Sequence, residues 1–181
     1  MSVRIISGIW KGRKLEVVDS KSLRPSTDRV RKTIFDWLRP HIIEAKCLDA
    51  FAGTGVIGLE ALSSGANQTV FIEKNRHISR ILKDNLNKLQ VEEAGILVKS
   101  DALHYLNKAS HIQFDLVFLD PPFESNLLEK SLSLLHQHNW VHANSLVYFE
   151  CAAACEINFL HWKIYKHKTT KNIQYGLLQL S

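Results

Sequence analysis

Residues 47–58 read Cys47-Leu48-Asp49-Ala50-Phe51-Ala52-Gly53-Thr54-Gly55-Val56-Ile57-Gly58. The apolar start of this stretch is typical of a buried strand, and the pattern from Val56 to Ser63 is typical of a helix. The three glycines match G-x-G-x-x-G, and Glu73 follows 20 residues after the first of them, where an acid binds ribose hydroxyls in nucleotide sites. The stretch therefore predicts a nucleotide-type cofactor site, with a simple tight turn between strand and helix as the alternative.

The same alternation of strands and helices continues on both sides of this stretch. Before it, residues 4–7 and 13–18 resemble the strands of a hairpin, and a helix is expected from Thr27 or Asp28. After it, we expect the following strands and helices: strand 68–73, helix 78–89, strand 95–100, strand 114–119, helix 127–135, strand 146–150 and a final strand pair at 162–168 and 172–180. This order predicts an α/β, Rossmann-like fold whose mostly parallel sheet binds ligands at the carboxyl ends of its strands.

Four acids stand at or just after predicted strand ends: Asp49, Glu73, Asp101 and Asp120. The glycine motif first suggests NAD. Asp49, however, would repel a dinucleotide pyrophosphate and attract the ammonium of a methionine moiety, and Asp101 could accept the adenine amine. S-adenosylmethionine is thus the expected cofactor. The residues expected to bind it are Asp49, Phe51, Gly53, Thr54, Gly55, Gly58, Glu73, Asp101, Ala102 and Asp120.

The tetrapeptide Asp120-Pro121-Pro122-Phe123 follows the clearest apolar strand of the sequence. Two prolines fix the backbone and remove two N–H donors, which leaves a rigid group of acceptors around the Asp120 carboxylate. Such acceptors suit an exocyclic amine, whose lone pair they orient toward a methyl donor, and Phe123 could stack on the base. We expect these four residues to be catalytic, with an ordinary proline-rich turn as the alternative.

The positive charge of the chain is concentrated at its start. The 181 residues carry 23 Lys and Arg against 18 Asp and Glu, but residues 1–46 alone carry 11 against 5. This asymmetry predicts a polyanion partner, although a merely solvated surface would look the same. The residues expected to bind RNA are Arg4, Lys11, Arg13, Lys14, Arg24, Arg29 and Arg31. We expect residues 1–22 to be a basic hairpin arm and residues 23–181 the catalytic domain. Because the repeating strand and helix pattern begins only near Lys46, the chain should fold without residues 1–20.

Several classes of protein are not expected. No apolar run is long enough to span a bilayer and no signal-type segment opens the chain, so a cytoplasmic monomer without a membrane partner is expected. Three cysteines (Cys47, Cys151 and Cys155) predict reduced thiols. His136, His138 and His142, followed by two of these cysteines, match no standard zinc spacing, so no metal is expected.

Five motifs together closely resemble the bacterial 16S ribosomal RNA guanine-N2 methyltransferases. They are residues 4–15 (RIISGIWKGRKL), Leu23-Arg24-Pro25, Asp28-Arg29-Val30-Arg31, residues 49–55 (DAFAGTG) and Asp120-Pro121-Pro122-Phe123. The resemblance implies a class I methyltransferase fold with a seven-stranded sheet and S-adenosylmethionine as donor. It also implies methylation of one guanine of 16S rRNA in the small ribosomal subunit or its assembly intermediate.

Two other functions fit part of the sequence. An adenine-N6 methyltransferase acting on DNA or RNA would also use Asp-Pro-Pro-aromatic, because this motif suits any exocyclic amine. A non-enzymatic RNA-binding module would keep the basic N-terminal region, but the complete set of acids at the strand ends argues against a degenerate cofactor site.

Overall fold

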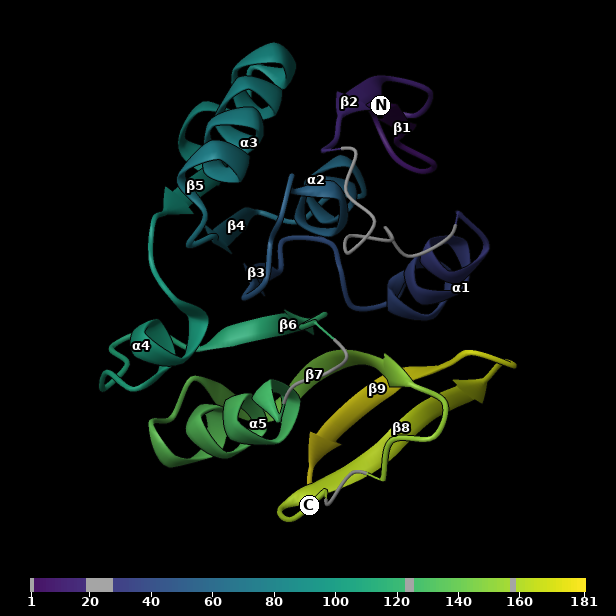
Figure 1. The fold of residues 1–181 in the computed structure, drawn as a ribbon, viewed down its shortest axis with the longest axis vertical. Helices are drawn as coiled ribbons and strands as arrows, with labels where there is room; N and C mark the ends of the chain where they lie inside the picture. The colour runs from purple at the N-terminus through teal and green to yellow at the C-terminus, as the bar shows by residue number, and fades with distance from the viewer. Residues whose placement is uncertain (1, 19–27, 123–125, 157–158) are drawn as a thin grey trace.

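The computed structural model describes residues 2–18, 28–122, 126–156 and 159–181. Its main sheet has seven strands in the order β5-β4-β3-β6-β7-β9-β8 (Figure 1). The strands are β3 (Lys46–Asp49), β4 (Gln68–Ile72), β5 (Gly95–Val98), β6 (Phe114–Leu119), β7 (Val141–Ala152), β8 (Trp162–Thr169) and β9 (Ile173–Leu180). Strands β3 to β7 run parallel, and β9 is antiparallel to both of its neighbours. The expected mostly parallel seven-stranded sheet is confirmed.

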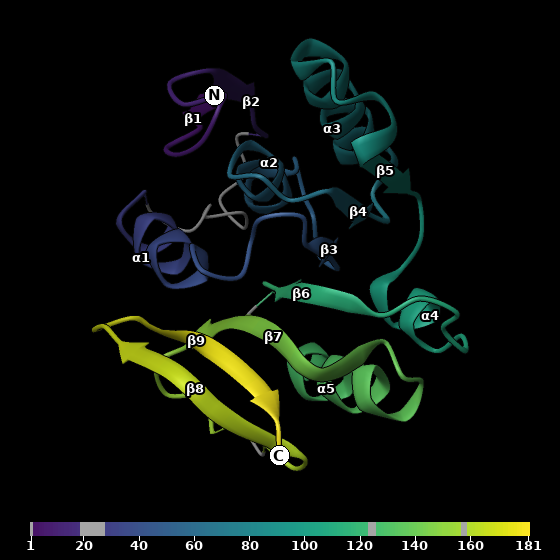
Figure 2. The ribbon, with the colours of Figure 1, turned by 180° about the vertical axis from the view of Figure 1, so that it is seen from behind.

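Helices cover both faces of the sheet (Figure 2). On β6, Leu116 and Phe118 pack against α1 (Asp28–Leu38), whereas Val117 and Leu119 pack against α5 (Leu127–Gln137). Helices α2 (Val56–Ser63) and α3 (Arg76–Leu89) lie on the α1 side, and the short α4 (Ala102–Leu106) lies on the α5 side. The central strand β6 is therefore buried on both faces, as expected for a parallel sheet.

Most element boundaries lie close to the sequence pattern, but the hairpin differs from it. Strand β1 (Ser2–Arg4) overlaps the expected strand 4–7 at Arg4 alone, and β2 (Lys14–Glu16) is shorter than the expected 13–18. The Ile6 and Ser7 amides donate to Glu60 instead of continuing the strand pair. Helix α2 and strand β6 begin and end where expected. Strand β7 begins at Val141 rather than Leu146, and the sequence pattern did not reveal α4 or the 3-10 turn Glu92–Ala94. None of the helices in the described ranges is long and apolar enough to span a membrane.

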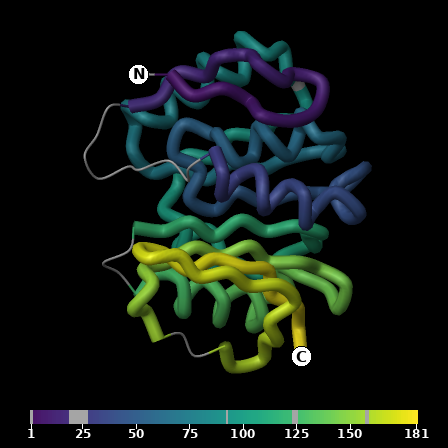
Figure 3. The backbone as a smooth tube through the Cα atoms, turned by 90° about the vertical axis from the view of Figure 1, so that its right-hand side faces the viewer, coloured from purple at the N-terminus to yellow at the C-terminus, as the bar shows by residue number. Residues whose placement is uncertain are grey.

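The N-terminal hairpin, β1 (Ser2–Arg4) and β2 (Lys14–Glu16), packs against the helices of the main domain. It lies at one end of the molecule and the β8–β9 pair at the other (Figure 3). Ile5 and Leu15 are 1% and 0% exposed, and they share a core with Leu59 of α2 and Leu82 of α3. The hairpin therefore contributes side chains to the core, which a strand pattern of three residues is too short to show. That the chain folds without residues 1–20 stays a prediction.

A buried glutamate fixes the hairpin to α2. Glu60 is 0% exposed, and its carboxylate accepts hydrogen bonds from the Ile6 amide at 2.8 Å, the Ser7 amide at 3.3 Å and the Ser7 hydroxyl at 3.1 Å. Arg31, also 0% exposed, donates to it at 2.7 Å and to the Arg4 carbonyl at 3.1 Å. Burial raises the pKa of Glu60, while the Ile6 amide and the Arg31 guanidinium lower it. We call Glu60, Arg31, Ile6 and Ser7 the Glu60 anchor.

Candidate active site

The glycine turn between β3 and α2 has a backbone that only glycine adopts easily. Gly53 and Gly55 have φ angles of 53° and 85°. The Gly53 amide donates to Glu73 Oε2 at 3.0 Å, and the Asn75 amide donates to Oε1 of the same carboxylate at 2.6 Å. No described atom lies within 4 Å of the place where a Cβ on Gly53 would stand. The turn therefore leaves open space directly beside a half-buried carboxylate.

Asp49 ends β3 beneath this turn and is almost completely buried, at 2% exposed. Its Oδ2 accepts a hydrogen bond from the Gly58 amide at 3.0 Å. The pKa of Asp49 is raised to about 7, mainly by burial; the charge of Glu73 adds to this rise, and the hydrogen bond from the Gly58 amide opposes it. Gly58 lacks a side chain for a separate reason, because a Cβ there would stand 2.3 Å from the Phe71 ring. In this structure Asp49 orients the start of α2, and its contact with a cofactor ammonium stays a prediction.

Asn85 of α3 connects the turn to the N-terminal hairpin. Its side-chain amide donates to the Thr54 carbonyl at 3.0 Å and to the Glu16 carbonyl at 2.9 Å, and its oxygen accepts from the Glu16 amide at 2.9 Å. The side chain is buried, at 1% exposed. Sequence reasoning missed this residue, since a single asparagine in an amphipathic helix usually faces solvent.

The structure places the other predicted cofactor residues around the same edge of the sheet. Asp101 follows β5 and caps α4 through the Leu103 and His104 amides, and its second oxygen lies 3.3 Å from the Lys74 ammonium. Burial raises the pKa of Asp101, but the His104 amide and Lys74 outweigh burial and lower it overall. Phe51 is half-buried against the core, and Thr54 and Ala102 are buried. An adenine amine would thus have to share Asp101 with the cap of α4.

Asp120 and Pro121 follow directly after β6, the central strand next to β3. Asp49 pairs in register with Phe118, so Asp120 stands at the same edge of the sheet as Asp49. Asp120 is half-buried, Pro121 is buried and Pro122 is exposed, whereas Phe123 lies outside the described residues. The structure therefore places Asp120-Pro121-Pro122 and the glycine turn at the ends of neighbouring strands, as the sequence predicts.

Glu150 is an acid at this edge that sequence reasoning did not single out. Leu119 pairs with Phe149, which puts Glu150 of β7 beside Asp120. Glu150 is 4% exposed and accepts a hydrogen bond from the Tyr148 hydroxyl at 2.7 Å. Its position at the end of a predicted strand was the same signal that identified the other four acids.

The predicted RNA-binding residues do not share one environment. Arg4, Lys11, Arg13, Lys14 and Arg29 are exposed. Arg24 lies outside the described residues. The expectation that Arg31 binds RNA is wrong. Its side chain is completely buried and paired with Glu60 and Asp28, so it cannot contact RNA. The physical reason is that charge counting treats every arginine as a surface group, whereas this one forms an ion pair with a residue 29 positions away.

The histidines and the C-terminal cysteines have ordinary surroundings. His142 Nε2 lies 3.1 Å from Asp115, and the His136 ring stacks on His161 with centroids 4.3 Å apart. Burial is the main cause that raises the pKa of Cys151 to about 12, so its thiol stays protonated and unreactive at neutral pH.

Comparison with known proteins agrees with this geometry. A family model described as conserved hypothetical protein 95 matches residues 3–179. The chain belongs to this family. Curated relatives include ribosomal RNA small subunit methyltransferase D of Haemophilus influenzae, which is 43% identical over 180 residues that cover 98% of this chain and 93% of the relative. The protein of the same name from Escherichia coli K12 is 41% identical over 179 residues, covering 98% and 89%.

Solved structures of family relatives share the whole fold. A structure from Escherichia coli described as a methyltransferase superposes with a TM-score of 0.91 at 39% identity and covers 100% of this chain and 99% of its own. A methylase structure from Haemophilus influenzae has a TM-score of 0.87 at 38% identity, with 99% of each chain covered. The sheet order and these neighbours identify the fold as that of class I methyltransferases, as the sequence motifs imply. The chain is a methyltransferase of the ribosomal RNA small subunit methyltransferase D family.

Proposed function

We propose that this protein transfers a methyl group from S-adenosylmethionine to the exocyclic N2 amine of one guanine in 16S rRNA. The single observation that carries the proposal is the pairing of two sites at one edge of the sheet. The glycine turn with Glu73 ends β3, and Asp120-Pro121-Pro122 ends the adjacent strand β6. The relatives' names support ribosomal RNA of the small subunit as the substrate.

The residues at the turn fit S-adenosylmethionine. Glu73 already accepts a backbone hydrogen bond and has a half-exposed carboxylate beside open space, so it suits ribose hydroxyls. The first amides of α2 offer donors for the methionine carboxylate. The expected ammonium would favour the ionised form of Asp49, which is buried behind the turn, and this charge would in turn attract the ammonium. When bound, S-adenosylmethionine supplies an electrophilic methyl group.

Asp120 would act on the target amine. The lone pair of an aromatic amine is delocalised into its ring, which makes the amine a poor nucleophile. A carboxylate that accepts an N–H of the amine directs this lone pair and stabilises the positive charge that develops on nitrogen. The buried Pro121 holds Asp120 against the end of β6, and the amine proton can pass to water afterwards. We further propose that Phe123 stacks on the guanine and that residues 1–22 contact RNA through Arg4, Lys11, Arg13 and Lys14.

The test is methyl transfer to small ribosomal particles from a strain that lacks the gene for this protein. We expect one N2-methylguanosine to appear in 16S rRNA, located by mass spectrometry of nuclease fragments. Duplex DNA and particles from the wild-type strain serve as controls. Methylation of adenine, or of the duplex DNA, would favour the adenine-N6 alternative instead.

Cofactor choice has its own test. We expect calorimetry to show binding of S-adenosylmethionine and its demethylated product, with no heat from NAD. Binding of NAD without a response to the methyl donor would overturn the assignment of the cofactor site.

A further inference from the structure

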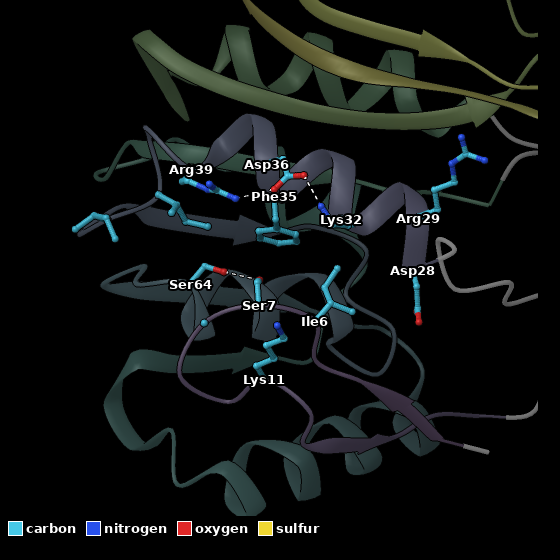
Figure 4. Close-up of a pocket in the computed structure, with 13 residues that line it drawn as sticks. Ile6, Ser7, Lys11, Asp28, Arg29, Lys32, Phe35, Asp36, Arg39 and Ser64 are labelled. Atoms are coloured by element: carbon cyan, nitrogen blue, oxygen red, sulfur yellow. Dashed lines mark hydrogen bonds and ion pairs between the residues drawn. The ribbon is translucent and has the colours of Figure 1, made fainter.

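Helix α1 lies between the N-terminal hairpin and the β8–β9 pair (Figure 1). A groove of about 700 Å³ runs along its hairpin side, between α1, the turn after β1 and the end of α2 (Figure 4). Phe35 and Ile42 give it an apolar floor, and the basic residues Lys11, Arg29, Lys32 and Arg39 stand along it. The groove is separate from the glycine turn, because none of its lining residues belongs to the cofactor site.

Two basic side chains, one in α1 and one just after it, form only solvent-exposed ion pairs. Lys32 and Arg39 both pair with Asp36, at 3.0 and 2.8 Å, yet their side chains remain 74% and 79% exposed. The hydrogen bond from Lys32 is the largest influence on the pKa of Asp36 and lowers it, and the charges of Lys32 and Arg39 lower it further, whereas burial raises it. Exposed ion pairs of this kind are weak. A polyanion could therefore take both cations at little cost, and one carboxylate cannot neutralise two of them.

The other flank of α1 adds two lysines from the far end of the sequence. Lys166 and Lys168 of β8 reach over the Trp37 ring, with their ammonium groups 6.0 and 5.6 Å from its centroid. Strand β8 reads WKIYKHKT and contains no acid. Its lysines, which on sequence alone resemble an ordinary solvated strand face, thus gather at the same helix as the groove. We call Lys11, Arg29, Lys32, Arg39, Lys166 and Lys168 the α1 surface.

The α1 surface extends away from the catalytic edge of the sheet. Arg39 follows the end of α1, shortly before β3 begins at Lys46, so it lies toward the edge opposite Asp49. The turn that carries Lys11 is bonded near the end of α2, where the Ile9 amide donates to the Ser63 carbonyl at 2.8 Å. Helix α1 spans 11 residues, or about 16 Å at 1.5 Å per residue. This length is enough for cations to meet more than one phosphate of the same RNA.

We propose that the α1 surface binds the phosphate backbone of the RNA substrate at a distance from the target base. The inference rests on the proposed function, because it assumes that RNA is the substrate. The four cations that line the groove share it with two acids, Asp28 and Asp36, and two more cations stand over Trp37 on the other flank of α1. Backbone contacts provide most of the affinity for a large nucleic acid, whereas the active site contacts one base.

The test compares two double variants with a matched control. K32A/R39A and K166A/K168A each remove two cations of the α1 surface, whereas K108A/K130A removes two exposed lysines from the α4–α5 side of the sheet. Binding to naked 16S rRNA and to unmethylated small particles is measured over a range of salt. For each α1-surface variant we expect weaker binding and a salt slope lower by about 0.7 to 0.9 for each phosphate that is no longer neutralised. The control should keep the wild-type slope.

Three outcomes would overturn the inference or confirm it. Slopes equal to the control in both α1-surface variants would overturn it. Weaker binding to particles with unchanged binding to naked rRNA would also overturn it, and would indicate a ribosomal protein as the partner. A reduced slope on both substrates confirms it. Thermal unfolding and S-adenosylmethionine calorimetry on the same variants show that fold and cofactor site are intact. If the wild-type protein itself transfers no methyl group to rRNA, the proposed function fails instead.

Discussion

Two carboxylates, Glu60 within α2 and Glu73 directly after β4, have opposite surroundings. Glu60 is fully enclosed and accepts from two backbone amides, one hydroxyl and one guanidinium. Glu73 accepts from two backbone amides and keeps part of its surface in solvent, next to open space. This difference shows that a ligand site is identified by the remaining hydrogen-bonding capacity of its acids and not by their number. An acid whose acceptors are saturated by its own chain holds the fold, and one with remaining capacity can hold a ligand.

Arg31→Met should produce the largest effect on stability. It leaves the Glu60 charge buried without its cationic partner, which typically costs about 3 to 5 kcal/mol. Urea unfolding measures the change in the free energy of unfolding. The double variant R31M/E60Q should recover part of the loss because it leaves no buried charge, although the single amide oxygen can replace only one of the two acceptors that Ile6 and Ser7 use. A single variant as stable as the wild type would show that the Glu60 anchor does not hold the hairpin.

Asp120→Ala should have the largest effect on activity and little effect on stability. The carboxylate is expected to stabilise charge that develops in the transition state, so turnover should fall by about 100- to 1,000-fold. Cofactor affinity should stay within about tenfold of wild type, as measured by calorimetry. Single-turnover methylation of unmethylated particles gives the rate. A near-wild-type rate would remove Asp120 from the mechanism.

Glu73→Ala should weaken binding of S-adenosylmethionine by about 1 to 3 kcal/mol, because it removes the ribose acceptor and leaves the Gly53 amide without its partner. Glu73→Gln is the matched variant. It keeps an acceptor for Gly53 and should lose less affinity than the alanine variant. Equal losses would mean that the Gly53 contact, and with it the shape of the turn, contributes little to binding.

Asp49→Asn should change how the stability of the protein depends on pH. The pKa of Asp49 is raised to about 7, above its ordinary value of 3.8, so the folded protein holds this proton more tightly than the unfolded chain. The resulting stabilisation is complete below about pH 4 and is lost as pH rises through 7. Between pH 5 and 8 the wild type should therefore lose about 1 to 3 kcal/mol more than D49N in the absence of cofactor. Parallel pH profiles of the melting temperature would contradict this assignment.

Much of the site could be predicted from sequence because its residues are local to strand ends. Asp49, Glu73 and Asp120 each follow an apolar run, and parallel strands bring such ends to one edge. The sheet itself follows from the same runs, since Phe114–Leu119 is apolar except for Asp115 and ends abruptly at Asp120.

The contacts that sequence could not reveal join residues far apart in the chain. Glu60 stands within an apolar helix and its partners Ile6 and Arg31 are 54 and 29 positions away. No local pattern distinguishes this glutamate from a solvated one, nor Arg31 from its exposed neighbour Arg29. Helix α4 was not predicted for a different reason: its five residues are too few to show a helical period.

The attachment of the N-terminal hairpin also has a kinetic consequence. The hairpin is synthesised before its hydrogen-bonding partners Glu60 and Asn85, which are separated from Ile6 and Glu16 by 54 and 69 residues. Closing loops of this length costs conformational entropy, which is offset only once the hairpin contacts have formed. Contacts between residues so far apart in the sequence therefore slow folding. During synthesis the apolar side chains of Ile5 and Leu15 therefore cannot be fully buried until α3 has left the ribosome. The hairpin, although synthesised before α2 and α3, is therefore among the last elements to reach its final contacts.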